Sequence, residues 1–127
     1  NKHNINHKKS TRDIMSEIQE IGYLSYDSIL KGDLQQFGKL LDRHYYLKRK
    51  ISSNMSSKRL NQIYDYAISN GSIGGKNIGA GGGGLFMFYV SKNKQYKFRE
   101  AMTSKGLIEL RWSYENKGVR LINFFRF

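Results

Sequence analysis

The chain is 127 residues long, 39% of them hydrophobic, and carries a net charge of +12 from 22 Lys and Arg against 10 Asp and Glu. This length and composition suit one domain with a single core, and no stretch approaches the roughly 20 apolar residues of a membrane span. No signal-peptide pattern opens the chain, and the lack of Cys excludes disulfides and thiolate metal sites. The sequence therefore predicts a cytoplasmic protein without a membrane partner.

The positive charge is spread over the whole sequence. It will attract anions, from nucleotide phosphates to nucleic acid or acidic lipid, but the densest basic runs are only Lys8-Lys9 and Lys48-Arg49-Lys50. A dedicated nucleic-acid face usually concentrates its charge, so the pattern favours a solvated basic surface and argues against nucleic acid as a partner. The three His are too few and too scattered to indicate a metal site.

The first ten residues, NKHNINHKKS, are polar and lack an initiator Met. We interpret residues 1–10 as a flexible lead-in and residues 11–127 as one domain cut from a longer protein. Apolar residues then recur at helical spacing in Ile14, Ile18 and Ile21, which predicts a first amphipathic helix. Gly32 stops this helix, and Asp33 is placed to cap the next one.

Two more helices complete the first half. The second has the apolar stripe Leu34, Phe37, Leu40, Leu41 and Tyr45. It ends in the basic turn 48–50, which the negative end of the helix dipole favours without any ligand. Ser56 or Ser57 can cap the third helix, and Asn70-Gly71 ends it. The predicted buried face of this third helix is Leu60, Ile63, Tyr64, Ala67 and Ile68.

The second half changes to the period of strands. Residues 85–90 form a continuous apolar run, typical of a central strand covered on both faces, and residues 74–79 are predicted to be extended. Residues 94–104 can form a short helix. Its inward-facing residues are expected to be Tyr96 and either Phe98 or Met102.

The last segment alternates like a half-buried strand over residues 108–114. The expected core-facing residues are Ile108, Leu110, Trp112 and Tyr114. The sequence ENKG at 115–118 indicates a hairpin turn, and residues 119–124 return as the partner strand. The predicted fold class is α+β, with a helical layer packed on a small, mainly antiparallel sheet.

A glycine-rich segment opens the central strand. The sequence GGKNIGAGGGGLFMFYV, residues 74–90, holds seven glycines in its first eleven positions. A flexible linker fits poorly, because a helix and a buried strand flank the segment directly. The alternative is a turn whose N–H groups face an anion, or whose bare Cα atoms let a ligand or another backbone approach. It is neither a Walker loop nor a Rossmann fingerprint.

The longer stretch NGSIGGKNIGAGGGGLFMFYV resembles the third motif of the GHMP small-molecule kinases, K-x-x-GAGGGG followed by an apolar strand. The matching residues are Lys76, Gly79, Ala80, Gly81, Gly82, Gly83 and Gly84. The resemblance covers about residues 28–124. Upstream it looks like the sugar-1-kinase branch, whose corresponding helix tends to read L-[LM]-H-E-x-W-x-x-K-K. His44 and Lys48 fall in that stretch, whereas Asp42 and Tyr45 replace the common His and Trp.

The resemblance implies a ferredoxin-like C-terminal domain and a reaction that uses ATP and Mg²⁺. A phosphoryl group would pass to a sugar hydroxyl, expected to be the anomeric hydroxyl of D-glycero-D-manno-heptose 7-phosphate. Gly79 to Gly84 would then lie at the nucleotide and substrate cleft with Lys76 beside them. For Lys76 the alternative is a solvated lysine at a strand end, and for His44 a packing role competes with a sugar contact.

The family's phosphate-binding motif P-x-x-x-GLGSSAA is missing from this sequence, and no Asp or Glu is placed to act as the catalytic base. The resemblance assigns both, and the Mg²⁺ ligands, to an N-terminal domain of the same chain, so these 127 residues alone should be inactive. Three alternatives stay open: an L-fucose or galactose-type kinase, a catalytically dead relative, and a module that binds RNA or another polyanion. For the last, Arg111 and Arg120 offer cations.

Overall fold

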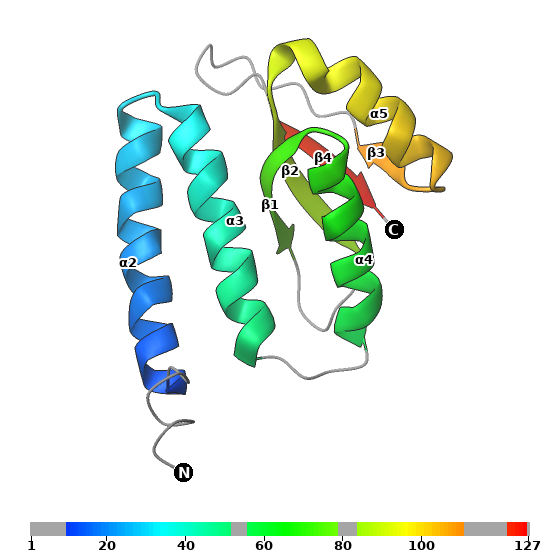
Figure 1. Cartoon of the computed structure of the whole chain (residues 1–127). Helices are drawn as coiled ribbons and strands as arrows, with labels where there is room; N and C mark the ends of the chain where they lie inside the picture. The colour runs from blue at the N-terminus through cyan, green and yellow to red at the C-terminus, as the bar shows by residue number, and fades with distance from the viewer. Residues whose placement is uncertain (1–9, 52–55, 79–83, 111–121, 127) are drawn as a thin grey trace.

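The computed structural model describes residues 10–51, 56–78, 84–110 and 122–126, and Figure 1 shows their arrangement. The elements in chain order are α2 (Thr11–Leu30), α3 (Leu34–Ile51), α4 (Ser56–Ser69), β1 (Ser72–Ile78), β2 (Leu85–Val90), the 3₁₀ turn η1 (Lys92–Lys94), α5 (Gln95–Ser104), β3 (Ile108–Leu110) and β4 (Ile122–Arg126). This order confirms the predicted α+β class.

Helices α2 and α3 form an antiparallel hairpin. The hydroxyl of Ser10 caps α2 by accepting a hydrogen bond from the Asp13 N–H at 3.1 Å. Gly32 turns the chain with a φ of 72°. The Asp33 carboxylate then accepts from the Gln36 N–H at 3.0 Å, which confirms the predicted cap of α3. A small core between the two helices consists of Ile14, Ile18, Ile21, Leu40 and Leu47.

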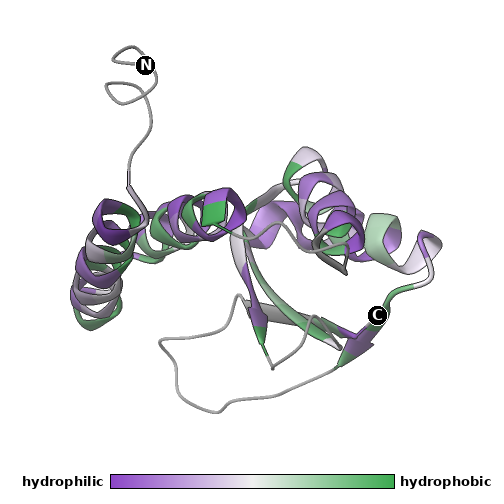
Figure 2. Ribbon diagram, turned by 90° about the horizontal axis from the view of Figure 1, so that it is seen from below, coloured by the Kyte–Doolittle hydropathy of each residue, from purple (hydrophilic) through white to green (hydrophobic). Residues whose placement is uncertain are grey.

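The four strands form one antiparallel sheet in the order β1-β2-β4-β3. This is the order that a ferredoxin-like βαββαβ unit has after its first strand is moved to the C-terminal end. Strand β2 is interior, as predicted, but its two faces are not covered equally: Phe86 and Phe88 are fully buried, whereas Leu85 and Met87 are only partly buried. Figure 2 shows α4 and α5 on one side of the sheet, with α2 and α3 beyond its β1 edge.

The main core lies between the sheet and the pair α4 and α5. Phe88 of β2 is fully buried at its centre, with ring-centroid distances of 6.1 Å to Tyr64, 5.7 Å to Phe98 and 6.3 Å to Phe125. The buried residues of this core are Leu60, Tyr64, Ala67, Phe86, Phe88, Val90, Phe98, Met102, Leu107 and Phe125. The predicted buried face of α4 is thereby confirmed for Leu60, Tyr64 and Ala67, while Ile63 and Ile68 are partly buried against it.

The prediction for Tyr96 is wrong. Phe98 and Met102 are fully buried, but 74% of Tyr96 is exposed. Phe98 and Met102 are one helical turn apart and share one face of α5, whereas Tyr96 precedes Phe98 by two positions and points to the other side. Only Phe98 and Met102, which are four residues apart, therefore face the sheet when α5 packs on it.

The predicted orientation of β3 is also wrong. Ile108 and Leu110 are 53% and 40% exposed, and the half-buried Glu109 lies between them. Glu109 pairs with the buried Phe125 of β4 on the helix-covered face, and Arg99 of α5 donates to its carboxylate at 2.9 Å. Leu107, just before the strand, supplies the buried aliphatic side chain instead.

The pairing of the last two strands is as predicted, but their bounds differ. Strand β4 pairs antiparallel with β3 and continues to Arg126, two residues beyond the predicted end. Trp112, Tyr114 and the predicted turn at 115–118 lie outside the described residues. Helix α4 spans Ser56–Ser69, so Ser56 and Ser57, the two predicted cap residues, already belong to the helix. Asn70 and Gly71 follow it as predicted, and Gly71 has a φ of 113°.

Candidate functional site

Helix α3 packs directly on the backbone of the edge strand β1. A Cβ on Gly74 would lie 1.9 Å from the Gly38 carbonyl oxygen and 2.8 Å from the Asp42 nitrogen. A Cβ on Gly75 would lie 2.7 Å from the Met87 carbonyl oxygen of β2. Both glycines are therefore needed for close backbone approach, and the helix covers the strand edge.

A partly buried hydrogen bond joins α3 to α4. The Tyr64 hydroxyl donates to the Asp42 carboxylate at 2.6 Å. Burial, and next this hydrogen bond, raise the pKa of Tyr64 far above its ordinary value of 10.0. Asp42 thus links α3 to α4.

Two further contacts extend the same interface. The ring of Tyr45 stacks on that of Tyr64 with centroids 3.7 Å apart, and its hydroxyl donates to Asn61 at 2.7 Å. The Arg49 guanidinium donates two hydrogen bonds, of 2.9 Å and 2.8 Å, to the Asp65 carboxylate. These contacts fix the rotation of α3 about its axis, which in turn fixes the direction of its remaining side chains.

His44 and Lys48 share one face of α3, and the charges of Lys48 and of Lys76 in β1 both act on His44. His44 is half-buried, whereas both lysines are exposed. Burial, and next the positive charges of Lys48 and Lys76, lower the pKa of His44 from 6.5 to about 4. The imidazole is therefore neutral at pH 7 and can donate one N–H and accept one hydrogen bond.

The group of His44, Lys48 and Lys76 lies toward the end of β1, just before the glycine segment of residues 79–84. Lys76 is two residues before Ile78, the last residue of β1, which pairs with Leu85 at the start of β2. Gly84 has a φ of 81°, so it adopts a left-handed conformation that other residues rarely reach. The predicted site residues Gly79, Ala80, Gly81, Gly82 and Gly83 lie outside the described residues.

The structure thus brings the two separately predicted residues His44 and Lys76 to one place. Lys48 lies in the stretch of the sequence that resembles the sugar-1-kinase branch, but it was not proposed as a site residue, because a basic turn at a helix end has an adequate explanation in the helix dipole. The spacing of four residues between His44 and Lys48 was the available signal, since it puts both on one helix face.

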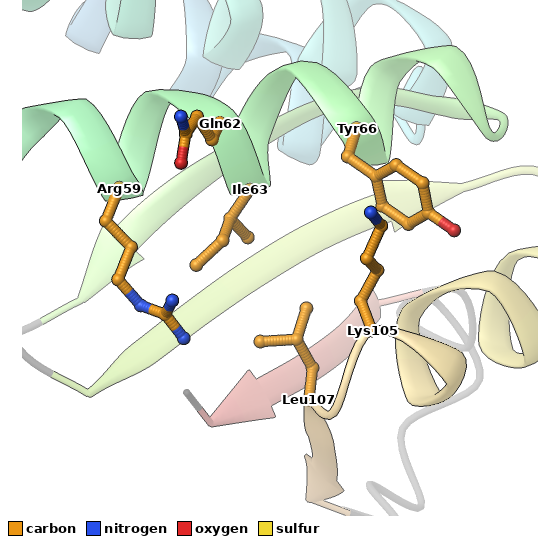
Figure 3. A pocket seen from close by; sticks show the side chains of 6 residues that line it. All are labelled: Arg59, Gln62, Ile63, Tyr66, Lys105 and Leu107. Atoms are coloured by element: carbon orange, nitrogen blue, oxygen red, sulfur yellow. The ribbon is translucent and has the colours of Figure 1, made fainter.

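A second concave region lies between α4 and the turn after α5, and Figure 3 shows it from close by. Its volume is about 480 Å³. The Lys105 ammonium lies 4.9 Å from the centroid of the Tyr66 ring at one end. The lining residues are Arg59, Gln62, Ile63, Tyr66, Lys105 and Leu107.

The described ranges contain no candidate metal centre and no candidate membrane-spanning helix. No three or more His, Cys, Asp or Glu side chains of these residues come together as they would around a metal ion. Among the described helices, none combines the length and apolar character needed to cross a bilayer.

Comparison with known proteins connects this geometry to a family. The chain matches the family model described as GHMP kinases C terminal over residues 25–108, which is more than half of its length. It is also similar to D-glycero-alpha-D-manno-heptose 7-phosphate kinase of Campylobacter jejuni subsp. jejuni serotype O:2, with 28% identity over 106 residues. That similarity covers 84% of this chain but only 31% of the relative's length. The chain therefore belongs to the GHMP kinase family and has the fold of that family's C-terminal domain.

Proposed function

We propose that this chain supplies the C-terminal domain of an ATP-dependent sugar kinase whose acceptor is D-glycero-D-manno-heptose 7-phosphate, phosphorylated at its anomeric hydroxyl. The family match and the name of the Campylobacter relative support a kinase of this kind. The observation that carries the proposal is the pairing of Ile78 with Leu85, which lie on either side of the glycine segment, together with the effect of the Lys76 charge on His44.

Phosphoryl transfer suits such a site because it depends mainly on positioning and on neutralising charge. ATP supplies the phosphoryl group, and we assign the segment Gly79 to Gly84 to the cleft where it meets the acceptor, with Lys76 beside this segment on the acceptor side. Backbone N–H groups of a glycine segment stabilise the negative charge of a phosphoryl group. His44 is placed on the acceptor side, since it comes from the helix rather than from the segment itself.

The described residues fit phosphate better than they fit Mg²⁺. Magnesium in kinases is held by carboxylates, and no cluster of such ligands occurs in the described part of the chain. We therefore expect the Mg²⁺ ligands, the phosphate-binding loop and the catalytic base in an N-terminal domain of the same chain. We also expect a cytoplasmic location and no turnover by these 127 residues alone.

The test is an assay of ATP consumption by the full-length protein with heptose 7-phosphate, L-fucose and galactose as separate acceptors. The proposal expects turnover with heptose 7-phosphate and a much lower kcat/KM for the other two. Preference for L-fucose or galactose would mean that the protein is a kinase of that sugar instead. Absence of turnover with all three, together with RNA binding that weakens steeply with salt, would favour the polyanion-binding alternative.

A further inference from the structure

His44, Lys48 and Lys76 are brought together by the way α3 lies along β1. The two elements run side by side in the same direction (Figure 1), and Asp42 sits directly over Gly74. From this point β1 advances about 7 Å to Lys76. Helix α3 advances about 3 Å to His44 and about 9 Å to Lys48. Lys76 is therefore level with the turn of α3 that carries the other two.

Lys48 and Lys76 differ from the neighbouring Arg43 and Arg49 in their ion-pair partners. Arg43 forms an ion pair with Glu17, and Arg49 forms one with Asp65. Within the described ranges, neither Lys48 nor Lys76 has a carboxylate within ion-pair distance. The charges of both lysines act on the half-buried imidazole of His44, so an anion bound beside these three side chains would be favourable.

We propose that His44, Lys48 and Lys76 form the binding site for the phosphate that the sugar acceptor already carries, the one that is not transferred. This proposal rests on the proposed function. A phosphate monoester is a dianion with three acceptor oxygens, which two ammonium groups and one imidazole N–H complement. The sugar's phosphate fits better than the phosphates of ATP, because ATP arrives with Mg²⁺ and this cluster contains no carboxylate to hold that ion.

The kinetic test uses the full-length kinase with heptose 7-phosphate and with the same heptose lacking its phosphate. In Lys76→Ala we expect the KM for heptose 7-phosphate to rise about tenfold or more, with kcat, the KM for ATP and the KM for the unphosphorylated sugar nearly unchanged. Lys48→Ala should act in the same direction, and Lys76→Arg should restore most of the affinity. The matched control is Lys97→Ala, an exposed lysine of α5, which should change none of these constants.

Other outcomes separate the possible failures. If Lys76→Ala raises the KM for ATP instead, the cluster binds the nucleotide and the proposal is wrong. If both sugars are affected equally, the cluster does not recognise phosphate. If the wild-type protein phosphorylates no sugar, the proposed function fails, and inorganic phosphate then tests the anion site directly.

For that direct test the imidazole resonances of His44 are followed by NMR while inorganic phosphate is added to the full-length protein. A bound phosphate should raise the pKa of His44, and Lys76→Ala should weaken the response. Resonance shifts at Arg59 and Lys105 with none at His44 would place the anion in the pocket between α4 and the turn after α5, and would overturn the assignment.

Discussion

Gly74 of β1 lies so close to Gly38 of α3 that a Cβ on Gly74 would be 1.9 Å from the Gly38 carbonyl oxygen. The obstacle is backbone of a packed helix, so it cannot rotate away as a side chain could. We expect Gly74→Ala to lower the free energy of unfolding by about 2 kcal/mol or more, as overpacking does in cores. Urea denaturation followed by circular dichroism would measure the loss.

Gly22→Ala is the matched control for this substitution. Gly22 lies inside α2, and a Cβ there would meet nothing within 4 Å. Alanine should therefore stabilise the helix, by about 0.5–1 kcal/mol. If the two variants changed stability in the same direction and by similar amounts, the close approach of α3 to β1 would be disproved.

The hydrogen bond from Tyr64 to Asp42 gives a second prediction. Tyr64→Phe keeps the buried ring but leaves the half-buried carboxylate without the donor that lies 2.6 Å from it. We expect a loss of about 1–3 kcal/mol in the free energy of unfolding, because a charged group loses its partner.

Tyr45→Phe is the comparison for that variant. It removes a hydroxyl from the same interface, but the acceptor is the neutral Asn61 amide at 2.7 Å, so about 1 kcal/mol or less is expected. Thermal unfolding of both variants would rank them. A larger loss for Tyr45→Phe than for Tyr64→Phe would show that Asp42 does not depend on Tyr64.

Much of this fold could be predicted because the relevant signals are local. The apolar stripe with Ile14 and Ile21, the Asp33 cap and the apolar run of β2 each reflect neighbours within a few residues, and the structure confirms all three. The proximity of His44 to Lys76 could not be predicted in this way. It depends on α3 docking on β1 through Gly38 and Gly74, which are 36 positions apart in the sequence.

The orientation of β3 was mispredicted for a related reason. The sequence correctly predicted that side chains around Glu109 alternate between the two faces of the sheet. Alternation alone does not indicate which of the two faces a helix will cover. That face is fixed by β4, which lies between β2 and β3 and turns Phe125 and Glu109 toward α5. The apolar face with Ile108 and Leu110 is consequently exposed in the described structure.

This orientation leads to a third prediction, for neighbouring aliphatic residues. Leu107→Ala should lower the free energy of unfolding by about 2–5 kcal/mol, since Leu107 is buried in the main core. Ile108→Ala should change it by only about 0.5 kcal/mol, because Ile108 is largely exposed. Chemical denaturation of the two variants would measure both changes. A larger loss for Ile108→Ala than for Leu107→Ala would show that Ile108 faces the core, as the sequence predicted.

The fourth prediction concerns pH. The pKa of His44 is lowered from 6.5 to about 4, mainly by burial. Above pH 6.5 the imidazole is neutral in both the folded and the unfolded chain, so its protonation does not make stability depend on pH there. Between pH 6.5 and about 4 the unfolded chain binds a proton that the folded one does not, so the free energy of unfolding falls as the pH falls.

Urea denaturation at several pH values between 6.5 and 5 would measure this slope, in a window where most carboxylates are still ionised. His44→Gln has no imidazole to protonate, so its stability should depend less on pH over the same window. Saturating inorganic phosphate should reduce the slope of the wild-type protein, because an anion beside the imidazole favours its protonated form. A slope that His44→Gln leaves unchanged would mean that His44 titrates alike in both states, and that α3 does not bury it against β1.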